Sequence, residues 1–104
     1  MDVAMAAAVI SSVASFLSQQ LAKHHQAETT SGESESSREL GLALLAGMQA
    51  AATIIGSEQR LRKLSEDRAN ELSELTVRLR EKGESVSPEE VKSVAVKLTA
   101  IAPS

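Results

Sequence analysis

The stretch LGLALLAGMQAAATIIG, residues 40–56, decides the fold expected for this chain. It contains no charged residue, and glycine and alanine are interspersed among leucine, methionine and isoleucine. A helix that is apolar on nearly every side must be buried on most sides, because apolar surface is unfavourable in water. Three environments satisfy this requirement: the core of a helical bundle, a seam between identical subunits, and a membrane.

The composition predicts an all-α protein with a single helical domain, residues 1–104. Apolar residues make up 42% of the chain, but there is no cysteine and Phe16 is the only aromatic residue. The abundant residues alanine, leucine and glutamate have high helix propensity, and no segment shows the alternating pattern of a strand. The net charge of -3 argues against a nucleic-acid partner, because phosphate binding needs clustered lysine and arginine.

An N-terminal helix rich in alanine and serine is predicted over about residues 3–24. Apolar residues form one stripe of this helix, and small residues form a second stripe. Small side chains allow the backbone of a neighbouring helix to approach closely. We therefore predict a packing seam between this helix and residues 40–56. Its members are Ala4, Ala8, Ser11 and Ser15 in the first helix and Ala43, Gly47 and Ala50 in the second.

The same segment bears on location and on metal binding. It begins with Asp2 and has no basic residue before its apolar part, which is atypical of a secretory signal peptide. The location stays unknown, since a cytoplasmic protein, a virion protein and one exported by a dedicated machine all fit. His24 and His25 are adjacent, point in different directions on a helix and lack a third ligand. We expect them to interact with the C-terminal end of the helix dipole, with no metal and no cofactor.

A long central helix is predicted over about residues 38–82, after a polar flexible connector at 26–37. Ser36 and Glu39 have the spacing of a capping box, and Gly83 is a plausible C-terminal cap. A continuous helix of this length would measure roughly 65 Å at 1.5 Å per residue. One short chain cannot cover such a rod.

The C-terminal helix has the clearest local signal, and it is predicted over residues 88–101. Ser87 is the N-cap, Pro88 occupies the first helical position, and Glu90 completes a capping box. The short link before this helix should fold it back as a hairpin on the end of the central helix.

A predicted interface follows from a straight central helix, because neither hairpin partner would cover its middle. We predict that this stripe packs against a second copy or a helical protein partner, which gives an oligomeric helical bundle. A bend at Gly56 would instead give a compact monomer and weaken the argument. The predicted interface residues are Leu61, Leu64, Arg68, Leu72, Leu75 and Leu79.

The function expected from these features is that of a non-enzymatic assembly or adaptor subunit. A component of a virion, a filament or a secretion-type machine fits, as does a helical partner-chaperone. No cluster of nucleophile, base and acid suggests catalysis, so we expect no catalytic residues. The alternative is a membrane-active protein that inserts residues 3–22 and 40–56 as an apolar hairpin.

Overall fold

The computed structural model describes residues 2–31 and 35–101, with the backbone alone described at 26–31, 36 and 84. The described residues form helices and turns, with no strand among them, which confirms the all-α prediction. In chain order the elements are α1 (Val3–Ser31), α2 (Glu35–Ile55), α3 (Glu58–Lys63), α4 (Glu66–Lys82), the short 3-10 helix η1 (Gly83–Ser85) and α5 (Pro88–Ile101).

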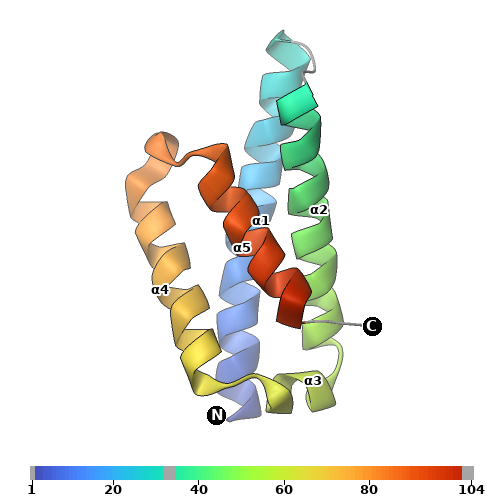
Figure 1. Ribbon diagram of the computed structural model, residues 1–104, viewed down its shortest axis with the longest axis vertical. Coiled ribbons are helices and arrows are strands. Elements are labelled where there is room, and N and C mark those ends of the chain that lie inside the picture. The colour runs from blue at the N-terminus through green and yellow to red at the C-terminus, as the bar shows by residue number, and fades with distance from the viewer. Residues whose placement is uncertain (1, 32–34, 102–104) are drawn as a thin grey trace.

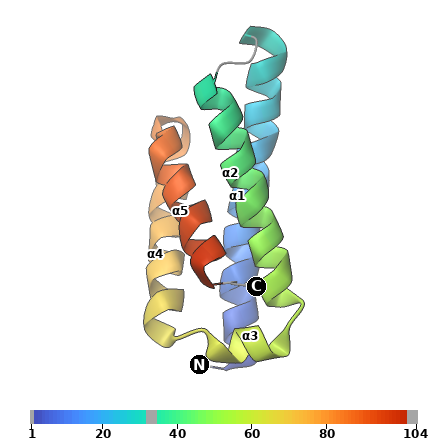
Figure 2. The same cartoon turned by 45° about the vertical axis from the view of Figure 1, so that its right-hand side comes forward.

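Four of these helices form a bundle of two antiparallel hairpins, α1–α2 and α4–α5 (Figure 1). Helix α1 packs against α2 and α4, and α2 also packs against α5. Short α3 crosses one end of the bundle and connects α2 with α4, its diagonal neighbour (Figure 2). At the other end the α1–α2 hairpin extends beyond the α4–α5 turn (Figure 1). The longest dimension, 43 Å, matches the length of about 43 Å expected for α1.

The prediction of one helix over residues 38–82 is wrong, because the chain breaks twice. Helix α2 ends before Gly56, and α3 ends at an extended Leu64. The hydroxyls of Ser57 and Ser65 each accept a hydrogen bond from the backbone N–H three residues later, at 3.3 and 3.1 Å. Two serine N-caps therefore satisfy the free N–H groups of two new helices, and the chain can turn across the bundle end.

The boundaries near the α1–α2 turn also differ from those expected. Helix α1 continues through Ser31 and α2 begins at Glu35, so helix covers much of the segment 26–37 predicted as a connector. Residues 32–34 of that segment lie outside the described residues. His24 is more than one turn from the end of α1, so its predicted interaction with the helix terminus is wrong. Ser36 lies inside the first turn of α2 rather than before it.

The predicted bounds and caps of the C-terminal helix are confirmed. Helix α5 spans Pro88–Ile101, the N–H of Glu90 donates to the Ser87 hydroxyl at 3.3 Å, and the N–H of Ser87 donates to the Glu90 carboxylate at 3.1 Å. Gly83, with φ of 60°, ends α4 as expected. These signals are local, so the sequence is sufficient to place them.

The position of α5 differs from the one expected. The sequence predicts that it lies along residues 72–82, but it packs mainly against α2 and less extensively against α4. Gly47 explains this contact, since a Cβ atom at that position would lie only 2.9 Å from the Cβ of Ala95. The missing side chain lets α5 approach the α2 backbone closely.

The core is aliphatic apart from one aromatic ring and draws on α1 to α5. Its largest fully buried apolar side chains are Phe16, Ile10, Leu17, Val13, Leu44, Ile54, Leu72, Leu79, Leu98 and Val94.

Candidate interaction face

The leucine stripe predicted as an interface lies mostly inside the bundle. Leu61, Leu64, Leu72 and Leu79 are buried, Leu75 is half-buried and Arg68 is exposed. The breaks around α3 fold the two halves of the expected rod against α1 and α5, so the chain itself covers the stripe. The premise that this surface is uncovered is therefore wrong, and the interface predicted on it loses its basis.

The two halves of the predicted small-residue seam do not pack against each other. On α2, Gly47 and Ala50 are buried and Ala43 is half-buried. Gly47 faces Ala95 and Leu17, whose Cδ1 would lie 3.0 Å from an added Cβ. The α1 half instead faces solvent, since its four members are all exposed: Ala4, Ala8, Ser11 and Ser15.

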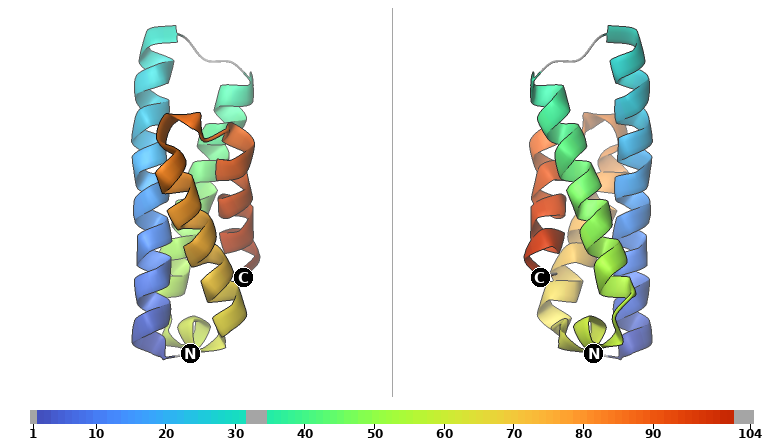
Figure 3. Two further views of the ribbon diagram at one scale, coloured as in Figure 1. Left: turned by 90° about the vertical axis from the view of Figure 1, so that its left-hand side faces the viewer. Right: turned by 90° about the vertical axis from the view of Figure 1, so that its right-hand side faces the viewer.

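Helices α1 and α2 lie side by side (Figure 3), and both have exposed residues in their uncharged stretches. Residues 3–22 and 40–56 contain no charged side chain. In each helix only 28% of the most apolar stretch is buried inside the protein. Nearly half of the residues in these two uncharged stretches are exposed, and others are half-buried.

One strip of this surface combines the outer sides of both helices, and we call it the α1/α2 face. On α2 the strip carries Leu42 and Leu45, which are 62% and 44% exposed. A hollow lined in part by Leu21, Leu42 and Leu45 shows that α1 and α2 border the same strip. Steps of three and four residues extend it along each helix. The face comprises Ser11, Ala14, Ser18 and Leu21 of α1 and Leu42, Leu45, Gln49 and Ala52 of α2.

His24 joins α1 to α2 at the end of this face. It is buried, and its Nε2 lies 2.5 Å from the carbonyl oxygen and 2.9 Å from the hydroxyl oxygen of Ser37, so Nε2–H donates to this residue. A Cβ atom at Gly41 would lie 2.8 Å from the His24 ring. A glycine is needed here because the imidazole lies directly on the α2 backbone. The sequence places His24 on a helix, as observed, but gives no sign of this contact.

The surface of α4 and α5 has a different chemical character. Lys97 pairs with Glu71 and Lys82 with Glu90, each at 2.6 Å. The hydrogen bond from Lys97 holds the pKa of Glu71 below its ordinary value. For Glu90 the bond from Lys82, followed by that from the backbone of Ser87, lowers the pKa in the same way. This side of the bundle is therefore a solvated charged surface.

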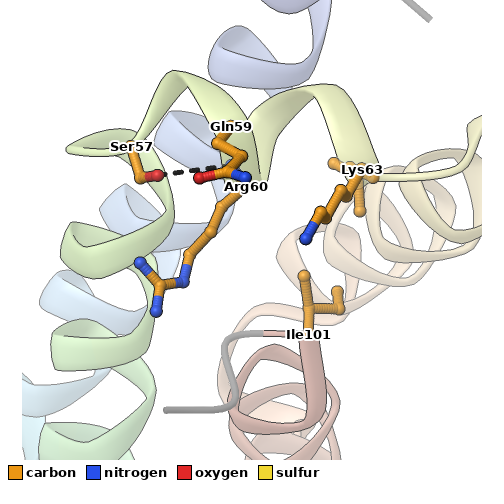
Figure 4. Close-up of a pocket in the computed structure, with 6 residues that line it drawn as sticks. Ser57, Gln59, Arg60, Lys63 and Ile101 are labelled. Carbon is orange, nitrogen blue, oxygen red and sulfur yellow. Dashed lines mark hydrogen bonds between the residues drawn. The ribbon is translucent and has the colours of Figure 1, made fainter.

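A separate hollow of about 240 Å³ lies beside α3, shown in Figure 4. Arg60 and Lys63 extend from α3 on either side of it, and Lys63 points toward Ile101. The hollow could accept an anion, but its lining contains neither a carboxylate nor a histidine to act as a general base. Within residues 2–31 and 35–101, no group of three histidine, aspartate or glutamate side chains could hold a metal ion.

Comparison of the chain with protein-family models, curated proteins and solved structures gave no match. The chain's own residues must therefore indicate its function, and the α1/α2 face is the surface feature that needs an explanation.

Proposed function

We propose that the protein is a non-enzymatic helical assembly or adaptor subunit that packs its α1/α2 face against another helical surface. The observation that supports this function is an exposed, uncharged face on two adjacent helices, with Leu42 and Leu45 projecting from it. Burying these two leucines would contribute about 1–2 kcal/mol each. Docking of a helix onto such a surface is a common mode of protein recognition.

The face differs from the exposed apolar side chains of α4 and α5. Val77 on α4 and Val96 on α5 are also exposed, at 50% and 63%. Charged residues stand close to each of them in sequence, Arg78 beside Val77 and Lys97 beside Val96. Single apolar residues on a charged surface are ordinary, whereas a continuous uncharged strip is typical of an interaction site.

Photo-crosslinking in the cells that make the protein tests this function. A photoreactive amino acid at Gln49, on the face, should give a discrete covalent adduct with a protein. The same amino acid at Asn70, exposed on α4, is the matched control and should give none. The double substitution Leu42→Glu and Leu45→Glu should abolish the adduct while circular dichroism stays unchanged. Equal adducts at both positions, or none at Gln49, would refute the proposal.

A membrane-active function is a second candidate, supported by one specific observation. Val3–His25 of α1 and Ser37–Ile55 of α2 are each long and apolar enough to cross a membrane. Insertion would require the α1–α2 hairpin to separate from α4 and α5, which would expose buried side chains such as Leu17 and Leu44. Liposome flotation followed by protease digestion tests it: insertion should protect a fragment containing both helices. Protein that stays in the aqueous fraction would exclude this function.

A further inference from the structure

We infer that the occupant of the α1/α2 face is a second copy of this chain, bound antiparallel across a two-fold axis near Gln49. This inference rests on the proposed function and names its partner. Three properties of the face support it: the absence of charge, the distribution of large and small side chains, and the area.

The absence of charge makes the face compatible with itself. In a two-fold interface the same patch is present on both sides, so any charged residue at its centre meets a like charge. From Leu40 to Gly56 and from Val3 to Ala22 there is no such residue. Two basic residues, His25 and Arg38, lie at one end of the face, where they line the hollow. An antiparallel pair keeps these ends of the two copies apart, whereas a parallel pair would bring them together.

The side chains of α2 are also complementary to themselves in the antiparallel arrangement. Leu42 and Leu45 project from one half of the face, and small Ala52 lies in the other half. A two-fold axis near Gln49 places Leu45 of each copy opposite Ala52 of the other. On α1 the residues of the face other than Leu21 are serine and alanine, which lets the two helices approach closely.

The area suits a weak dimer. The uncharged residues 3–22 of α1 and 40–55 of α2 lie side by side over about 25 Å of helix. Two adjacent helices, each about 10 Å wide, give a face of about 500 Å². Stable interfaces bury about 800 Å² on each partner and weak ones bury less, so a second copy should bind this face in a concentration-dependent way.

Cysteine crosslinking tests the inference directly, because the chain contains no cysteine of its own. Leu45→Cys protein mixed with Ala52→Cys protein should form a disulfide between the two different variants, since paired cysteines must lie within about 7 Å. Gln49→Cys should form a disulfide with itself. Asn70→Cys is the control on the charged side and should stay reduced.

Analytical ultracentrifugation of the unmodified protein completes the test. We expect a concentration-dependent dimer, and Leu42→Glu with Leu45→Glu should weaken it by roughly a hundredfold or more. A monomer at every concentration, or a dimer that crosslinks through Asn70→Cys, would overturn the inference. If the dimer is refuted in this way, photo-crosslinking at Gln49 in cells can still give an adduct whose mass differs from that of two copies of this chain. Such an adduct would support the proposed function with another protein as the partner, so failure of the dimer and failure of the proposed function are distinguishable.

Discussion

The close packing of α2 and α5 at Gly47 gives a prediction in which two physical effects oppose each other. Replacing a helical glycine by alanine normally stabilises a helix by about 1 kcal/mol, because alanine loses less backbone entropy. At Gly47 the new methyl group would lie 2.9 Å from the Cβ and 3.1 Å from the Cα of Ala95. Carbon atoms pack best at about 3.5–4.0 Å, so α5 would have to move away by about 0.5–1 Å.

Overpacking of this kind costs about 1–3 kcal/mol, which exceeds or cancels the gain in helix propensity. We therefore expect Gly47→Ala to lower the free energy of unfolding by about 1 kcal/mol, with a fall in Tm of about 4–8 °C. Urea titration and thermal melting, both followed by circular dichroism at one fixed protein concentration, measure these quantities.

Two further variants separate packing from propensity. Ala46→Gly changes an exposed residue of the same helix and should cost about 0.5–1 kcal/mol through propensity alone. Ala95→Gly in the Gly47→Ala background removes the methyl group that would lie 2.9 Å away, although the Cα of residue 95 stays at 3.1 Å. Part of the clash is then relieved, so the changes in the free energy of unfolding caused by the two substitutions should not be additive. If Gly47→Ala raised Tm by as much as Ala46→Gly lowers it, the close approach of α2 and α5 would be refuted.

Two other predictions concern capping and pH. Ser65→Ala removes the hydroxyl that accepts a hydrogen bond in the first turn of α4, so it should lower the free energy of unfolding in urea by about 1 kcal/mol. Ser93→Ala, on the exposed surface of α5, is the control and should leave the free energy of unfolding unchanged. Equal losses of stability in the two variants would contradict the capping role. The pKa of Glu90 is lowered in the folded state, so its contribution to stability is present above its ordinary value of 4.5 and is lost as the pH falls through the lowered value. Glu90→Gln should therefore be less stable than the parent at pH 7, and the difference should shrink in acid; urea midpoints from pH 2.5 to 7 that stay parallel would contradict this.

The local parts of the fold could be predicted from the sequence because their causes are local. Ser87, Pro88 and Glu90 satisfy backbone groups within one turn, and the bounds of α5 follow from them. The packing of the N-terminal helix along residues 40–56 is likewise both expected and observed. The break after Ile55 falls at Gly56, where the sequence allows a bend as the alternative to a straight helix. The break at Ser65 escapes prediction, although this residue is an ordinary N-cap, because leucines lie on both sides of it at helical spacing.

The candidate face could be predicted only in part. The pattern assigns Ala4, Ala8, Ser11 and Ser15 to helix packing, whereas they are exposed in the single chain. It places Leu61 and Leu64 on the surface, whereas they are buried. Both differences have one cause: a helical pattern shows which residues share a side of a helix, but not which neighbour covers that side.

The sequence alone determined that the chain is helical, where its last helix begins and ends, and that residues 3–22 and 40–56 carry no charge. These properties depend on propensity, capping and composition, which act over a few residues. Only the tertiary structure decided that the chain turns before and after α3 and that α5 packs closely on α2 at Gly47. It also decided that most leucines of α4 are buried, while Leu42 and Leu45 of α2 are exposed. These outcomes depend on contacts between residues far apart in the chain, where several packings satisfy the same pattern and close fit selects one of them.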